Sequence, residues 1–375
     1  MPKTSSPGSI QVARVLGIPV YVHFSWFIVF GLIAWTLATG YFPQHYPNLP
    51  VTSYWAKGLL ASLLFFVSIL LHELGHSLVA LKSGIAIRSI TLFIFGGVAR
   101  LERDPPDGRT ELKMAAAGPA VSVVLSGLFL GAGSLARPGG TVWAVARYLA
   151  LINLVVAVFN LVPAFPLDGG RLLRGLLWKS MGKTRATRVA ARAGTLFAYF
   201  LIASGVISML RGAGISGMWY VLIGWFLKDA AAGAYQSARV DEALRGVTAA
   251  DAMLREVAML PAEISLAEAV HDYFLRSGYG AYPVVRGDTV VGLLCRRDVL
   301  KVPADDRERT SVQAAMTPLG ELVVIPPGAP LLRAMSKMAE SGIGRLLVME
   351  GGRLVGLLTM SSVLRHVRVR EELGQ

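Results

Sequence analysis

The sequence predicts a multi-pass α-helical membrane domain, with six transmembrane helices and a small membrane-associated β-hairpin, followed by a soluble α/β domain. Of the 375 residues, 54% are hydrophobic and only 16% are charged, and the mean hydropathy is +0.54. Such a chain is too apolar for an ordinary soluble protein of this length. The long apolar runs end near residue 235, and the composition after that point is typical of a soluble domain.

Six apolar runs are long enough, or nearly so, to cross the hydrocarbon core of a bilayer as helices. They cover residues 18–42, 55–81, 114–136, 143–165, 194–210 and 217–235. A chain with these runs is expected to be an integral protein of the cell membrane, with the lipid bilayer as its solvent.

Lysine and arginine are concentrated on one side of these spans. They fill the connections after the second and fourth runs, whereas the opposite connections hold few, chiefly Arg137 and Arg211. By the positive-inside rule, this asymmetry places the N-terminal tail and the C-terminal domain in the cytoplasm. The bilayer therefore accounts for the net charge of +13, and no nucleic acid partner is expected.

The segments outside the spans carry further signals. Residues 1–17 lack the apolar core and cleavage site of a removable signal peptide, so we expect a cytoplasmic tail. Residues 87–101 are rich in β-branched and aromatic side chains around Gly96-Gly97, which is typical of a short hairpin. Cys295 is the only cysteine, so the chain has no intrachain disulfide and no metal site built on several cysteines.

The C-terminal part is an internal repeat. Residues 277–300 align without a gap on residues 341–364, at an offset of 64 positions. Each copy is expected to form a helix, a strand, a glycine turn, a second strand and a further helix, and the two copies bury each other's apolar faces. The predicted domain boundaries are 1–17 for the tail, 18–235 for the membrane domain, 236–246 for a linker, and 247–303 and 304–370 for the two copies.

His72-Glu73-Leu74-Gly75-His76 predicts a zinc site. Residues four apart lie on one face of a helix, so both imidazoles reach one metal ion, and Glu73 lies beside the water that the ion binds. The alternative is a polar packing cluster. Three ionisable side chains near the end of a transmembrane helix are costly unless they face the bundle interior and have a function, which favours the metal site.

A catalytic zinc ion takes three protein ligands and keeps one open position. The end of the fourth span supplies the carboxylate of Asp168, which follows two prolines and precedes Gly169-Gly170. The alternative for Asp168 is an N-cap of a helix that begins at Gly169. Beside the two histidines, the ligand interpretation is favoured.

These motifs resemble the site-2 protease family of intramembrane zinc metalloproteases over about residues 15–235. The matching segments are HELGH, FGGVAR at 95–100, AAGPAVS at 116–122 and NLVPAFPLDGGR at 160–171. The resemblance implies zinc held by His72, His76 and Asp168, with Glu73 as general base and Asn160 as a contact to the substrate. Many relatives have Asn where this chain has Ser122, to which we assign no role.

The same resemblance implies that the substrate is a single-span membrane protein, cleaved within or near its transmembrane segment. Relatives cleave membrane-anchored regulators in this way. A helical substrate must first be unwound, and we expect the hairpin, over residues 91–95, to pair with the extended segment.

The repeat resembles a pair of CBS modules, which bind adenine nucleotides through a Gly-h-h-Ser/Thr-x-x-Asp segment, where h is apolar. The first copy keeps the acid as Asp298 but has Cys295 in place of the hydroxyl residue, and the second keeps the hydroxyl of Thr359 but has Ser362 in place of the acid. Each predicted nucleotide site is therefore half complete. Two alternatives stay open: a regulatory nucleotide sensor, and a module that joins two chains in a homodimer without a ligand.

Two other functions compete with proteolysis. A CBS-regulated membrane ion transporter would need charged groups along a path through the membrane, whereas here they converge on one predicted metal site. A catalytically inactive relative that only binds membrane segments is expected to lack the general base, and Glu73 is present. The substrate's identity and the direction of regulation do not follow from the sequence.

Overall fold

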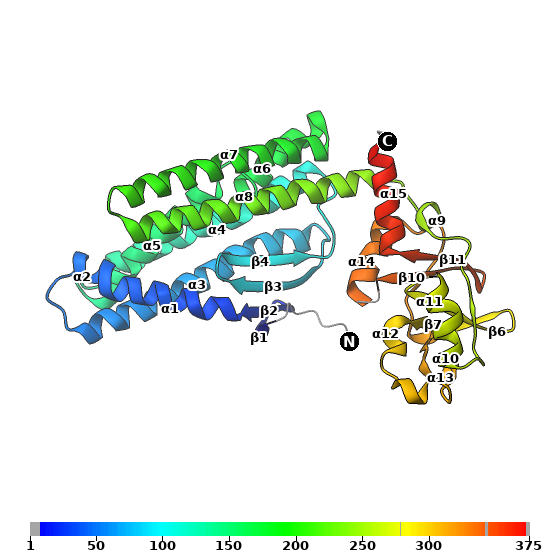
Figure 1. Cartoon of the computed structure of the whole chain (residues 1–375). Coiled ribbons are helices and arrows are strands. Elements are labelled where there is room, and N and C mark those ends of the chain that lie inside the picture. The colour runs from blue at the N-terminus through cyan, green and yellow to red at the C-terminus, as the bar shows by residue number, and fades with distance from the viewer. Residues whose placement is uncertain (1–7, 278, 342–343, 373–375) are drawn as a thin grey trace. The chain divides into compact units, whose positions relative to one another are not determined.

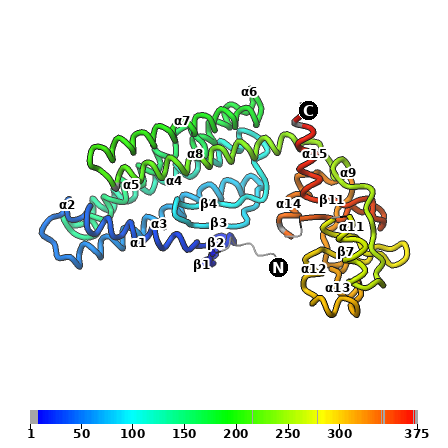
Figure 2. Tube along the Cα trace, in the orientation of Figure 1, coloured from blue at the N-terminus to red at the C-terminus, as the bar shows by residue number. Residues whose placement is uncertain are grey.

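The computed structural model describes residues 8–277, 279–341 and 344–372. Residues 1–7 of the predicted tail lie outside this part. The chain divides into two compact units between Ala238 and Arg239 (Figures 1 and 2). The first unit contains the long apolar helices and one sheet, and the second contains the repeat.

Five helices in the described part are long and apolar enough to cross a membrane. The first of them is continuous through a turn of π-helix, η1, that joins α1 to α2. The five are α1 (Phe24–Thr36) with η1 (Leu37–Tyr41) and α2 (Phe42–His45), α3 (Val51–Lys82), α4 (Gly108–Leu135), α5 (Thr141–Asn160) and α7 (Lys183–Leu210).

The sixth predicted span corresponds to α8 (Gly214–Ala243), which is helical throughout but is not one of these five. Its sequence is interrupted by the adjacent charges of Lys228 and Asp229. The ammonium group of Lys228 lies 5.4 Å from the centre of the Tyr199 ring on α7. Between α5 and α7, the shorter helix α6 (Asp168–Met181) follows an irregular loop.

The predicted hairpin is half of a larger sheet. β3 (Ile87–Phe93) and β4 (Gly96–Leu101) form the hairpin, and β1 (Ser9–Val15) and β2 (Ile18–His23) extend it to the order β1-β2-β3-β4. β2 runs parallel to β3 and antiparallel to β1. The expectation that the first helix begins at residue 18 was therefore wrong: it begins at Phe24, because residues 18–23 pair with β1 and residues 20–22 also pair with β3. Within the predicted tail, residues 9–15 form β1.

The sheet order also corrects which strand has a free edge. β3 lies between β2 and β4, and residues 90–92 are paired on both sides. Within the described residues, the free edge next to the hairpin turn belongs to β4.

Helix α3 packs closely against α4 beside the histidine motif. A Cβ atom at Gly75 would lie 2.8 Å from Val121 Cγ2 and 3.0 Å from the carbonyl oxygen of Ala117. Only glycine permits this backbone approach. The two histidines of α3 are thereby placed against the α4 backbone.

The second unit contains two small sheets, one for each copy. The order in the first is β5-β6-β7-β8, and the order in the second is β11-β10-β9. The strands are β5 (Leu260–Pro261), β6 (Ala281–Arg286), β7 (Thr289–Cys295), β8 (Thr317–Pro318), β9 (Val324–Ile325), β10 (Arg345–Glu350) and β11 (Arg353–Thr359).

Short helices connect these strands in both copies. In the first copy they are α9 (Ala249–Ala252), α10 (Leu266–Glu268), the π-helix η2 (Ala269–Phe274), α11 (Leu275–Ser277) and α12 (Arg296–Val299). In the second they are η3 (Ala304–Asp306), α13 (Val312–Ala315), η4 (Leu319–Glu321), α14 (Leu331–Ser341) and α15 (Met360–Glu372).

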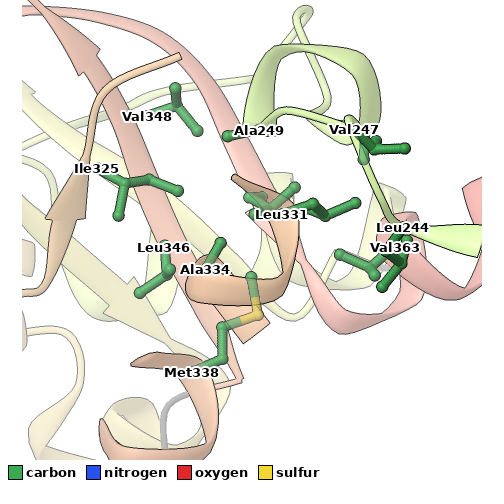
Figure 3. Close-up of a cluster of buried hydrophobic side chains, with 12 residues drawn as sticks. Leu244, Val247, Ala249, Ile325, Leu331, Ala334, Met338, Leu346, Val348 and Val363 are labelled. Atoms are coloured by element: carbon green, nitrogen blue, oxygen red, sulfur yellow. The ribbon is translucent and has the colours of Figure 1, made fainter. Parts of the chain in front are cut away.

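The two copies exchange the segments that precede them. β8, which leads into the second copy, pairs with β7 of the first. Leu254, at the start of the first copy, forms a bridge with Leu357 of β11. The cluster in Figure 3 shows the same exchange, because Leu244 and Val247 pack with Ile325 and Leu346 of the second copy. The copies are thus one folding unit.

Candidate metal centre

The two histidines of the motif lie on one face of α3. His72 is 5% exposed and His76 is 6% exposed. At 1.5 Å per residue, His76 lies about 9 Å from the last residue of α3, so the motif is inside the helix rather than at its end. Burial of both imidazoles among membrane helices needs compensation by polar partners.

Asp168 is the first residue of α6, and Leu167 is its N-cap. The carboxylate therefore does not cap the helix, and it is directed at the histidines instead. The glycines after it allow the loop from α5 to fold onto the first turn of α6. A Cβ atom at Gly169 would overlap the carbonyl oxygens of Leu161 and Val162.

Three donor atoms of these residues form a nearly equilateral triangle. Asp168 Oδ2 lies 3.1 Å from Nε2 of His72 and 3.1 Å from Nε2 of His76, and the two Nε2 atoms are 3.2 Å apart. A tetrahedral zinc ion with bonds of about 2.0–2.1 Å places its ligands about 3.3 Å apart. The triangle thus has the size that three zinc ligands require.

The other nitrogen of each imidazole has its own partner. His72 Nδ1 is 2.9 Å from Ser122 Oγ, and His76 Nδ1 is 2.7 Å from the carbonyl oxygen of Met114. When Nδ1 carries the proton and donates it to these oxygens, the Nε2 lone pairs are directed at the triangle. Both contacts come from α4, so this helix sets the tautomer and the orientation of the two ligands.

Gly118, also on α4, lies directly over the triangle. A Cβ atom at this position would overlap Nε2 of both His72 and His76. Since Met114, Gly118 and Ser122 are spaced by four residues, they form one stripe on α4 that faces the histidines.

The predicted general base is next to the triangle and beneath the sheet. Glu73 is half-buried and follows His72 on α3. A Cβ atom at Gly97 of β4 would lie 2.5 Å from Glu73 Cγ and 3.1 Å from Cδ. Asn160, the predicted substrate contact, is the last residue of α5 and is half-buried. Its side chain has no hydrogen bond within the described residues.

A buried ion pair joins α6 to α4. Glu111 is fully buried in the first turn of α4, and Arg174 donates to both of its carboxylate oxygens. Arg171 lies 3.7 Å from the same carboxylate. The Arg174 guanidinium also lies 4.9 Å from the centre of the Phe165 ring, in the loop that leads to Asp168. The Glu111–Arg174 pair therefore connects the loop that leads to Asp168 to α4, the helix that orients the two histidines.

Replacing Glu111 by Leu is expected to destabilise the membrane unit by about 3–5 kcal/mol, because two guanidinium groups would lose their buried counter-charge. We expect weaker zinc retention as well, by roughly tenfold, since α6 would no longer be held to α4. Thermal unfolding in detergent and zinc content during dialysis measure these two effects.

The double variant Glu111→Leu/Arg174→Leu separates the two effects. Apolar replacement of both partners is expected to recover part of the stability, while zinc retention stays low. An unfolding temperature of Glu111→Leu equal to that of wild type would contradict the structural role assigned to the pair.

In the second unit, both predicted nucleotide contacts cap helices. Asp298 accepts from the backbone N–H of Cys295 and from Nζ of Lys301. Thr359 Oγ1 accepts from the backbone N–H of Ser362. The Asp298 carboxylate is buried and engaged through both oxygens, so it does not fit the predicted nucleotide contact without loss of these bonds, whereas the Thr359 hydroxyl keeps its proton and can still donate to a ribose or phosphate.

The sequence analysis does not predict a part in the metal centre for three residues: Glu111, Gly118 and Ser122. The available signal was the four-residue spacing of Met114, Gly118 and Ser122, which puts them on one helix face. That spacing does not say which neighbouring helix the stripe meets.

Comparison with known proteins gives two matching families. The model of peptidase family M50 matches residues 60–139 and 133–203, and that of the CBS domain matches residues 249–305 and 312–369. A solved structure, the site-2 protease from Methanocaldococcus jannaschii, is 32% identical, with a TM-score of 0.45 over 60% of this chain and 95% of that one.

Two curated relatives match over nearly the whole chain. "Putative zinc metalloprotease sll0528" of Synechocystis sp. is 36% identical over 367 residues, which is 95% of each chain. "Zinc metalloprotease MJ0392" of M. jannaschii is 30% identical over 363 residues, which is 97% of each chain. The chain therefore belongs to peptidase family M50, the site-2 protease family, and carries two CBS domains after its membrane unit.

Proposed function

We propose that this protein is a zinc endopeptidase that hydrolyses a peptide bond within or near the transmembrane segment of single-span membrane proteins. The observation that carries the proposal is the triangle of His72, His76 and Asp168, sized for zinc and buried among membrane helices. A substrate that reaches a site at this depth is itself a membrane segment.

The side chains around the triangle have the roles that hydrolysis requires. Zinc, when bound, polarises a carbonyl group and lowers the pKa of a water molecule. Glu73 accepts the proton of the attacking water and passes it to the leaving amine. Ser122 and the Met114 carbonyl hold the imidazoles in one orientation, which keeps the site preorganised. Asn160 is assigned to the substrate backbone, from the half-buried end of α5.

Reconstitution into liposomes with a single-span substrate tests the proposal. We expect two products whose new termini, mapped by mass spectrometry, lie inside or next to the span, and no products after zinc is removed by a chelator. Cleavage only in long soluble loops of the substrate, or cleavage that survives complete zinc removal, would contradict it.

An unwound substrate segment can pair with the free edge of β4. An extended segment added to this edge would satisfy its own backbone groups there, as exposed strand edges permit. Gly97 of the same strand touches Glu73, so a segment paired with β4 would run beside the general base. We assign substrate pairing to β4 rather than to residues 91–95.

Proline scanning of β4 tests this assignment. Val98 and Ala99 are adjacent, so one backbone N–H faces β3 and the other faces the free edge. Because proline has no N–H, the variant at the outward position is expected to lose cleavage by at least about tenfold while keeping zinc. Equal cleavage by wild type, Val98→Pro and Ala99→Pro would exclude strand pairing at this edge.

The topology and the CBS pair complete the proposal. The concentration of Lys and Arg supports a cytoplasmic location for the N-terminus and the CBS pair. Because the carboxylate of Asp298 is buried and engaged by the cap of α12 and by Lys301, we assign the CBS pair a regulatory role through self-association of two chains. Light scattering of the full chain in detergent is expected to give a dimer, and a monomer at the same protein concentration would contradict the assignment.

A further inference from the structure

A cavity of about 230 Å³ lies between α7 and α8, and none of its lining residues belongs to the metal centre. The two helices run side by side (Figures 1 and 2) and touch through glycines, since a Cβ atom at Gly224 would lie 2.7 Å from the Ala198 carbonyl oxygen. The cavity lies towards the basic start of α7. Its lining consists of Arg188, Ala191, Arg192, Thr195, Ala231, Ala232 and Tyr235.

Two guanidinium groups lie at this cavity without a carboxylate partner in the described part of the chain. Arg188 is held in place by Tyr235, because its Nε donates to the phenol oxygen at 2.8 Å and its Cζ lies 5.4 Å from the ring centre. Arg192 follows one turn later and is exposed. Among the described residues, the carboxylate of Asp229 forms no ion pair with either arginine. The charge of the pair is therefore uncompensated.

The rest of the lining is apolar or already satisfied. Ala191 and Ala231 are buried, and the Thr195 hydroxyl donates to the Ala191 carbonyl oxygen at 3.0 Å. A free phosphate ion in this cavity would lose water against alanine walls that offer no donors in exchange. A phosphate attached to a glycerol and acyl chains would lose less, since its apolar part suits these walls.

An apolar path continues from the cavity along α7. Leu196 and Phe200 are 74% and 63% exposed, respectively, and follow Arg192 on the same helix towards the membrane interior. Tyr235 is at the opposite end, where aromatic side chains with a polar group are favoured at the membrane interface. Cationic groups at the headgroup level, with an apolar surface below them, match the two ends of one phospholipid.

We infer that this cavity is a binding site for an anionic phospholipid, with Arg188 and Arg192 on the phosphate and the acyl chains along α7. Arginine binds phosphate through paired N–H donors, and basic pockets between transmembrane helices bind anionic headgroups. A net-negative lipid such as phosphatidylglycerol is preferred over zwitterionic phosphatidylcholine, because the choline cation would be repelled by the two arginines.

Native mass spectrometry of the full-length protein, released from nanodiscs that contain phosphatidylglycerol and phosphatidylcholine, tests the site. Wild type is expected to retain phosphatidylglycerol preferentially, and Arg188→Ala/Arg192→Ala to retain it about tenfold less. Lys179→Ala/Arg185→Ala is the matched control. It removes the same charge from exposed positions near the start of α7 that do not line the cavity, and it is expected to behave as wild type.

A second variant leaves the charges in place. Ala232 lines the cavity but is exposed, so Ala232→Leu fills the space without disturbing the core, and it is expected to lose phosphatidylglycerol as well. Zinc content checks that each variant is folded.

Four results would overturn the inference. The first is an equal loss of phosphatidylglycerol in the control variant, and the second is equal retention of phosphatidylcholine by wild type. The third is displacement of the lipid by millimolar inorganic phosphate, which would make the free ion the ligand. Retention by both Ala232→Leu and the double arginine variant would likewise exclude the cavity.

Discussion

Replacing Glu73 by Gln is expected to stop peptide hydrolysis while zinc stays bound. The three donor atoms of the triangle belong to His72, His76 and Asp168, so the change removes no ligand. Glutamine has the same shape as glutamate, but its neutral amide cannot accept the proton of the attacking water. We expect a loss of at least about a hundredfold in cleavage rate, as general-base removal produces. Cleavage of a single-span substrate in liposomes measures it.

Zinc content and a second substitution serve as controls. Glu73→Gln is expected to keep one zinc ion per chain, whereas Asp168→Ala, which removes a ligand, is expected to lose it. In cell membranes, shortened single-span proteins are expected to accumulate in the Glu73→Gln strain, and proteomics would identify them as substrates. Full activity of Glu73→Gln would exclude the assigned role of this residue.

Replacing Gly118 by Ala is expected to expel the metal, although the change adds one methyl group to a helix. That methyl group would occupy the space of both Nε2 atoms. Relief would require α3 and α4 to separate and lose the close packing that they make at Gly75. Zinc affinity is therefore expected to fall by at least about a hundredfold, the upper range for changes around a metal site.

Gly127→Ala is the matched control on the same helix. A Cβ atom at Gly127 would meet no atom within 4 Å, so this variant is expected to keep zinc and to gain up to about 1 kcal/mol of helix stability. Zinc per chain and the unfolding temperature of both variants measure the contrast. Normal zinc content in Gly118→Ala would show that α4 does not lie against the histidines as described.

The sequence predicts those parts of the site that depend on local spacing. His72 and His76 are one helical turn apart, so their common face follows from helix geometry alone. Asp168 was found by a different argument, as a carboxylate at the end of a span beside two prolines. Its contact with α3 joins residues that are 96 positions apart, and only the resemblance to a family made it specific.

Contacts between distant helices and strands could not be predicted in this way. Gly118 and Ser122 act on the histidines through the packing of α4 on α3, which no local pattern specifies. The parallel pairing of β2 with β3 joins Val20 to Ile90, so an apolar strand at the N-terminus was assigned to the first span. The substrate pairing expected over residues 91–95 was wrong at residues 91 and 92 for the same reason, because β2 occupies that side of β3.

Helix capping explains why the sequence leaves nucleotide binding by the CBS pair open. Ser/Thr-x-x-Asp is both a nucleotide-binding pattern and a helix-capping pattern. In the structure, the side chains of Asp298 and Thr359 make the capping hydrogen bonds. The sequence alone does not distinguish these two uses of the same residues.

X-ray absorption spectroscopy at the zinc edge tests the central claim most directly. On purified full-length protein with one zinc ion per chain, we expect two imidazole nitrogens and carboxylate and water oxygens at about 2.0–2.1 Å, and loss of the bound zinc in Asp168→Ala. A zinc environment with one imidazole or none, or a metal-free protein that cleaves its substrate at the full rate, would contradict the account.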